Sequence, residues 1–155
     1  MLIKGDVIPP NHSKTIKLIE KNFKANESIR SFLYGKLFKK KKNYIEAYNY
    51  FQQSMKEGNI EAFYENAELL RKGYYQQENR NNNNNNMNDY NEEMINLYKE
   101  ASYKGNSKAI FQYAVIKSDK QLIKKAADKS CVKAMFYYVI ELETQDKIDE
   151  SIEYF

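Results

Sequence analysis

The sequence predicts an all-α fold, an α/α solenoid in which antiparallel helix pairs stack into a right-handed superhelix. Three observations predict it: four segments align without gaps, each has a turn residue at the same distance from its start, and the apolar spacing around that turn is helical. Such repetition is typical of folds in which every helix pair covers the apolar side of its neighbour.

The first helix of each segment carries two adjacent apolar residues, which begin three positions after the segment start. The segments start at Thr15, Ala47, Met94 and Asp119. Their apolar pairs are Leu18 and Ile19, Tyr50 and Phe51, Leu97 and Tyr98, and Leu122 and Ile123. This spacing predicts a helix with one apolar face in front of each turn.

A turn is predicted eleven residues after each start, at Asn26, Gly58, Gly105 and Ser130. Glycine and asparagine can adopt the left-handed backbone conformation that ends a helix. The next helix begins within a few residues, which leaves room only for an antiparallel neighbour. Each segment is therefore expected to form an αα-hairpin.

The second helix of each segment combines an aromatic column with a column of small residues three positions further. The aromatic column contains Phe32, Tyr64, Phe111 and Phe136. The second column contains Gly35, Ala67, Ala114 and Val139. A small side chain lets a neighbouring helix approach closely, whereas a large one would cost about 1–3 kcal/mol in overpacking strain.

The connections explain why the segment starts are separated by unequal spacings of 32, 47 and 25 residues. The longest spacing contains the asparagine tract 81–86 within a polar stretch from Gln76 to Asn91. That stretch has too few apolar residues to offset the entropy of ordering it, so a disordered Asn-rich loop is expected over 76–91. The shortest spacing leaves only Ser118 and Asp119 between two helices.

One helical-repeat domain is expected over 1–155, with incomplete units at both ends. Residues 149–155 match residues 45–51, which begins a fifth copy of the repeat, and residues 2–5 match residues 70–73.

Composition narrows the function classes. The formal net charge of +4 is too small to indicate nucleic-acid binding by itself. Cys131 is the only cysteine and His12 the only histidine, which excludes an internal disulfide framework and leaves no partner for a thiolate or histidine metal cluster. No apolar stretch reaches the length of a secretory signal or a membrane span. We expect no cofactor, no metal and no membrane partner.

The run from Lys39 to Lys42, preceded by Lys36, has two interpretations. Short basic runs serve as nuclear-import signals or contact phosphates. This run also falls where a helix should end, and cations stabilise a helix C-terminus, so a solvated helix end is the favoured interpretation. A cytoplasmic location is expected, with the nucleus as the alternative.

The recurrent residues resemble the Sel-1-like repeat, a relative of the tetratricopeptide repeat. Ala62, Asn66, Ala67, Leu70 and Gly73 are similar to its first helix. Residues 5–11 resemble its loop, and residues 124–129 resemble its second helix. Residues 101–106 resemble the end of that helix and the closing turn. The resemblance implies a stack of helix pairs whose concave face binds a protein or peptide, with no catalytic chemistry.

A non-catalytic interaction scaffold is therefore the expected function, with a protein or peptide as partner. The tetratricopeptide arrangement implies ligand-facing columns that contain Phe32, Lys36, Tyr64, Glu68, Phe111, Val115, Phe136 and Ile140. Packing between helices is an equally good interpretation of the aromatic column, because aromatic rings serve both cores and interfaces. RNA binding by helical repeats is the alternative function, although the unequal spacings argue against reading one base per unit.

Overall fold

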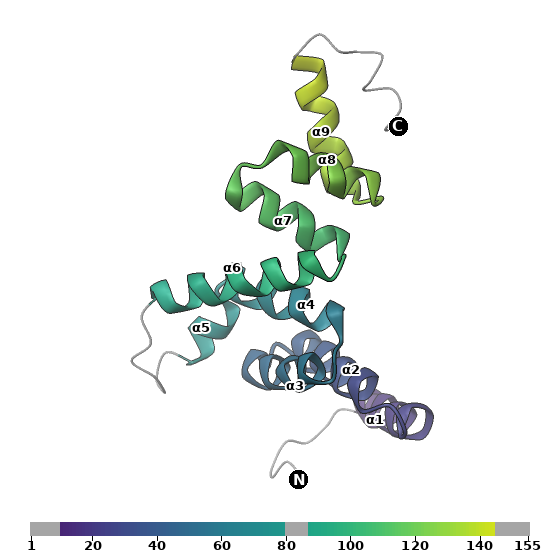
Figure 1. Ribbon diagram of the computed structural model, residues 1–155. Helices are drawn as coiled ribbons and strands as arrows, with labels where there is room; N and C mark the ends of the chain where they lie inside the picture. Colours follow the sequence, from purple (N-terminus) through teal and green to yellow (C-terminus); the bar gives the residue numbers. More distant parts are fainter. Residues whose placement is uncertain (1–9, 80–86, 145–155) are drawn as a thin grey trace. The chain divides into compact units, whose positions relative to one another are not determined.

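The computed structural model describes residues 10–79 and 87–144, and every regular element within those ranges is an α-helix (Figure 1). The all-α prediction is confirmed for this part of the chain. None of its helices is both long and apolar enough to cross a membrane. The chain divides into two compact units, Met1–Asn59 and Ile60–Phe155, which we describe separately. The single domain over 1–155 and its superhelical stacking stay predictions.

The first unit contains three described helices: α1 (Pro10–Phe23), α2 (Glu27–Lys40) and α3 (Tyr44–Lys56). Helix α2 packs most extensively on α3, and α1 packs on α2. Asparagine side chains cap the N-termini of α2 and α3. The Asn26 Oδ1 accepts a hydrogen bond from the Ile29 N–H at 3.0 Å, and the Asn43 Oδ1 accepts one from the Glu46 N–H at 3.1 Å.

The α2–α3 contact is built around Phe51, whose side chain is fully buried. Its ring lies 5.7 Å from the Phe32 ring, centroid to centroid. The same ring lies so close to Gly35 that a Cβ added there would be only 2.5 Å from its atoms. The Ser54 hydroxyl donates to the Ser28 carbonyl at 2.7 Å and ties the helices one turn away. The small column is thus used as predicted, to let a ring approach the backbone of α2.

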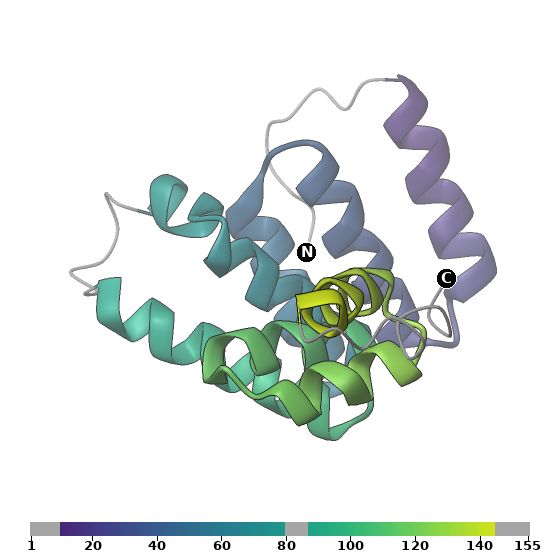
Figure 2. The same ribbon diagram turned by 90° about the horizontal axis from the view of Figure 1, so that it is seen from above.

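The second unit contains six described helices, and those on either side of each short turn pack together (Figure 2). They are α4 (Ile60–Arg71), α5 (Tyr74–Asn79), α6 (Met87–Tyr103), α7 (Ser107–Lys117), α8 (Lys120–Asp128) and α9 (Val132–Thr144). Helix α4 packs on α5 and α6, and α6 through α9 then pack in chain order, with a smaller contact between α7 and α9.

Three of the four short turns lie at the predicted positions, and the first is displaced by one residue. Gly58, Gly105 and Ser130 have left-handed backbones, with φ of 85°, 92° and 60°. Asn26 was expected to share this conformation and instead has an extended backbone with φ of −119°. It caps α2 as Asn106 caps α7, so the prediction was wrong by one position in this segment.

Helices extend into the predicted 76–91 loop from both sides. Residues 76–79 belong to α5 and residues 87–91 belong to α6. Two side chains anchor these ends: Gln76 is buried and donates to the Leu70 carbonyl at 2.9 Å, and Tyr90 is buried with its ring 5.9 Å from that of Tyr75. Residues 80–86 and the incomplete units at 2–5 and 149–155 lie outside the described residues.

The connection between α7 and α8 consists of two residues, as the sequence predicts. Ser118 takes a left-handed conformation with φ of 54°. The Asp119 N–H donates to the Ala114 carbonyl at 2.9 Å, and the Asp119 Oδ1 accepts from the Leu122 N–H at 3.0 Å. One residue therefore takes part in closing α7 and in capping α8.

Candidate protein-interaction surface

The structure separates the predicted ligand-facing residues into two groups. Phe32 and Lys36 lie on α2 in the first unit. Six others lie in the second unit, two each on α4, α7 and α9: Tyr64, Glu68, Phe111, Val115, Phe136 and Ile140. A candidate surface is therefore built within the second unit, and the first unit is treated on its own.

Three rings of the aromatic column are half-buried and pack against residues of later helices. Phe32 contacts Phe51, and the Tyr64 ring lies 6.1 Å from the Tyr98 ring. Phe111 packs with Leu122 against the buried cluster that includes Ile110 and Ala126. At these positions the column contributes to packing between helices.

Phe136 on α9 departs from this pattern, because its side chain is 62% exposed. Three neighbours on the same helix are also exposed: Val132 at 77%, Tyr137 at 48% and Ile140 at 45%. Positions 132, 136 and 140 are one helical turn apart, so their side chains follow one another along one face. We call these four residues the α9 stripe. Exposed apolar residues in this concentration mark interaction sites more often than isolated ones do.

A hollow of about 380 Å³ lies beside the α9 stripe, and we call it the aromatic groove. Tyr64 on α4, Phe111 on α7 and Val132 on α9 line it, and Lys108 and Lys133 contribute cationic groups. The Lys108 Nζ lies 5.9 Å from the centre of the Tyr64 ring. Burial, followed by the charges of Glu68 and Glu65, raises the pKa of Tyr64 to about 12. The Tyr64 hydroxyl is therefore protonated and able to donate a hydrogen bond at neutral pH.

Local hydrogen bonds fix the first turn of α7, which forms one edge of the groove. The Asn106 Oδ1 accepts from the Ala109 N–H at 2.9 Å, which caps the helix. The Asn106 Nδ2 also donates to the Glu61 carboxylate of α4 at 2.8 Å. A single buried side chain thus caps α7 and also connects it to α4.

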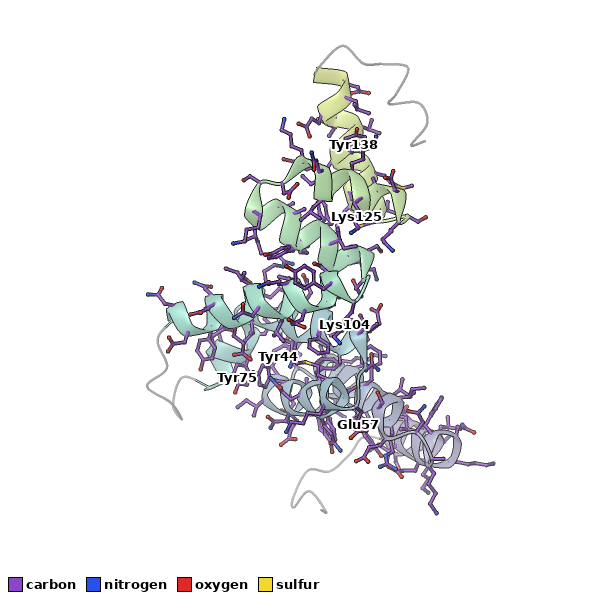
Figure 3. All side chains as sticks on the ribbon, viewed as in Figure 1. Tyr44, Glu57, Tyr75, Lys104, Lys125 and Tyr138 are labelled. Carbon is purple, nitrogen blue, oxygen red and sulfur yellow. The ribbon has the colours of Figure 1, made fainter. Side chains whose placement is uncertain are left out.

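A second hollow, of about 450 Å³, adjoins the groove along α9. It is lined by apolar side chains that include Val115, Tyr137 and Ile140. The Phe111 and Tyr137 rings meet edge to face at 6.1 Å, and each lines one of the hollows, so they form the boundary between them. Lys120 and Glu141 form an ion pair beside the second hollow. The second hollow is bordered by α7, α8 and α9, because Val115, Ile123 and Ile140 all line it. Lys125 on α8 and Tyr138 on α9, which Figure 3 labels, line neither hollow.

Glu68 is not available on this surface, which corrects one of the sequence-based expectations. It is buried, receives a hydrogen bond from the Tyr98 hydroxyl at 2.5 Å and forms an ion pair with Arg71 at 2.9 Å. Burial acts to raise the pKa of the Glu68 carboxyl, but the hydrogen bonds from Arg71 and Tyr98 outweigh burial and lower the pKa. The helical spacing placed this residue with the ligand-facing column, whereas its partners on α4 and α6 hold it inside.

Lys36 lies on the first unit, at the edge of an apolar hollow of about 650 Å³ between α1 and α2. Ile19, Leu33 and Leu37 provide its apolar lining, and Lys39 and Lys40 stand at its margin with Lys36. The basic run lies at the end of α2, as predicted, with Lys39 and Lys40 in the last turn and Lys41 as the C-cap residue.

Sequence reasoning missed Val132, Tyr137, Lys108 and Lys133 as parts of the surface. Val132 was detectable, because it precedes Phe136 and Ile140 by four and eight residues on the same helical face. Tyr137 and the two lysines were not, because only the packing of α9 against α7 brings them together. Cys131 is buried at the start of α9, which agrees with its interpretation as a small residue near a turn.

Compared with known proteins, the chain matches no family model and no curated protein. The resemblance to Sel-1-like repeats therefore stays a prediction.

Proposed function

We propose that the chain is a non-catalytic interaction scaffold of the Sel-1-like type, which holds a protein or peptide on the aromatic groove and the adjoining hollow of the second unit. The observation that supports this most directly is the distribution of exposed apolar side chains. Val115 and Ile116 on α7 and the four residues of the α9 stripe make up most of the large apolar residues exposed in the described parts of the chain.

The chemistry of the groove suits a polypeptide ligand. Its rings are half-buried and rigidly packed, so they offer apolar area without a large loss of side-chain entropy on binding. Lysines at its margin provide donors for carboxylates or backbone carbonyls of the partner. Aromatic anchors surrounded by polar groups are typical of the residues that dominate binding energy in protein interfaces.

A displayed library of random peptides tests this proposal. Peptides selected on the whole chain are expected to lose at least about tenfold in affinity for Phe111→Ala, since anchor residues commonly contribute more than 1 kcal/mol each. Tyr103→Ala is the matched control, because Tyr103 is an exposed aromatic residue of the same unit that lines neither hollow. Selected peptides that bind both variants equally well, or no selected peptide at all, would contradict the assignment.

Single-stranded RNA is the competing ligand, and a salt series separates the two. Binding that disappears with modest salt would reflect only the scattered lysines. Sequence-dependent binding that resists salt and is lost in Phe111→Ala would replace the scaffold proposal with the RNA-binding alternative.

A further inference from the structure

Helix α1 covers the neighbouring side of α2 only in part. Ile19 of α1 and Leu33 and Leu37 of α2 meet around a hollow of about 650 Å³, which we call the α1–α2 hollow. Ile19 and Leu37 are buried, so the apolar floor of this hollow lies below the surrounding surface. Ligand sites in proteins commonly have volumes of about 300–1,000 Å³. The first unit therefore has a recess of the size that receives a ligand, formed by different residues from the aromatic groove.

Three lysines stand at the margin of the α1–α2 hollow: Lys36, Lys39 and Lys40. Lys36 follows Leu33 by three positions and Lys40 follows Leu37 by three, which places these four side chains on one face of α2. That face therefore combines apolar side chains with two cationic groups one helical turn apart. A ligand that fits it carries apolar side chains and anionic groups at a similar spacing.

The lining of the α1–α2 hollow carries a net positive charge. None of the described residues that line it is acidic. Glu20 and Glu27 are the acidic residues of α1 and α2, and they accept hydrogen bonds from the side chains of Tyr34 and Gln53. Lysines at the end of α2 also stabilise that helix, but this role accounts for the charge and not for the apolar recess beside it. Together the recess and the charge indicate an anionic ligand with apolar side chains.

The shape and the lining of the α1–α2 hollow select among anionic ligands. Only two helices line it, whereas sites for small molecules enclose about 70–90% of the ligand surface. None of the described residues in its lining is aromatic, so the bases of a nucleic acid have no ring to stack on. A membrane surface binds apolar side chains that project outward, whereas Ile19 and Leu37 are recessed. An amphipathic helix fits, because its apolar side chains project into a groove between helices.

We propose that the α1–α2 hollow binds an acidic amphipathic helix of another protein. The apolar side chains of that helix enter the recess over Ile19 and Leu37, and its carboxylates lie beside Lys36 and Lys40. Exposed ion pairs contribute little affinity, so the apolar contact supplies most of it and the lysines select the charge of the ligand. This inference goes beyond the proposed function, because it places a second ligand on the first unit.

A displayed library of helical peptides, each with two leucines four residues apart and random flanking positions, tests the proposal on the whole chain. Peptides that bind the charge-reversed variant Lys36→Glu/Lys40→Glu are removed first, and those then selected on the parent chain are expected to be rich in acidic residues. Their affinity is expected to be at least about tenfold lower for the charge-reversed variant, since two attractions become repulsions.

The matched control is Lys17→Glu/Lys21→Glu, because these exposed lysines of α1 have the same spacing and do not line the hollow. It is expected to change the affinity by less than about twofold, because charges away from the contact are screened. Circular dichroism checks that both variants fold. An empty selection, selected peptides without an excess of acidic residues, or equal losses in the two variants would overturn the proposal.

Methyl NMR of the parent chain locates a selected peptide without any substitution. The largest shifts are expected at the methyl groups of Ile19, Leu33 and Leu37, while Val132 of the aromatic groove stays unchanged. Shifts at Val132 alone would assign the peptide to that groove and refute this site. Binding of phosphatidylserine vesicles in place of peptides, lost in the charge-reversed variant, would assign the hollow to a membrane surface. Peptides of the aromatic groove are sensitive to Phe111→Ala and those of the α1–α2 hollow are not, so each proposal can fail separately.

Discussion

Helices α2 and α9 carry the same column of the repeat in different surroundings. On α2 the ring of Phe32 is half-buried and packs against Phe51. On α9 the ring of Phe136 is 62% exposed among other exposed apolar residues. The residue type is the same, and the described difference is that Phe51 of α3 packs on the Phe32 ring. The position of an aromatic residue in a repeat therefore does not by itself decide whether its ring is buried.

The comparison of α2 with α9 predicts the largest difference in stability for substitutions of Phe51 and Phe136. Phe51→Ala is expected to lower the free energy of unfolding by about 4 kcal/mol, because it removes a fully buried ring and leaves a cavity between α2 and α3. Phe136→Ala is expected to cost about 1 kcal/mol, since the lost surface is mostly exposed. Urea unfolding followed by circular dichroism measures both. Equal costs would mean that α9 is covered as completely as α2.

A second prediction concerns the position four residues after the ring, where α4 has the buried Glu68 and α9 the exposed Ile140. Glu68→Gln is expected to destabilise the second unit by about 2 kcal/mol at neutral pH, the usual range for a hydrogen bond to a charged group. The exposed Ile140→Gln is expected to cost less than about 0.5 kcal/mol, because surface substitutions rarely exceed that.

The pH dependence of stability checks the same carboxylate. Because the pKa of Glu68 is lowered on folding, its contribution is present above the ordinary value of 4.5 and is lost as the pH falls through the folded-state pKa. The parent chain should therefore lose more stability than Glu68→Gln between neutral pH and the acid range. Parallel pH profiles for the two proteins would show that Glu68 is not the group responsible.

The smallest effect is expected at the turns that precede the two helices. Asn26 enters α2 through an extended backbone, whereas Ser130 enters α9 through a left-handed one, with φ of 60°. Ser130→Gly is expected to raise stability by about 0.5 kcal/mol, because the relief of left-handed strain is partly offset by the entropy of glycine. Thermal unfolding measures the shift, with Ser130→Ala as control. A lower midpoint for the glycine variant would show that the serine side chain stabilises the turn.

Much of the fold was predictable because local signals and packing agree. The turn residues and the apolar pairs are local features, so the helices around Gly58, Gly105 and Ser130 could be placed from sequence alone. The role of Gly35 was predictable as well, since a small residue in an apolar column implies a close approach. The turn predicted at Asn26 was displaced by one residue, because asparagine favours both a left-handed turn and a helix N-cap.

The candidate surface was less predictable, because burial depends on partners distant in the sequence. Glu68 is buried beside Tyr98, whose hydroxyl donates a hydrogen bond to it. Tyr98 follows the asparagine tract in the sequence, and nothing in the segment of Glu68 indicates that partner. The polar composition of 76–91 likewise gave no sign of the end of α5 or the start of α6. Gln76 bonds to α4, and the Tyr90 ring packs against α5. Periodicity assigns residues to a face of a helix, but it does not say whether another helix covers that face.

The two-residue link between α7 and α8 fixes the rotation of α8 about its own axis. Asp119 both bonds to the end of α7 and caps α8, so the link cannot change its length without breaking one of these hydrogen bonds. One inserted residue would turn α8 by about 100° and carry Ile123, Ala126 and Ala127 away from the interior. Insertions and deletions are therefore penalised at this junction much more heavily than between α5 and α6, where the sequence already carries a long asparagine tract.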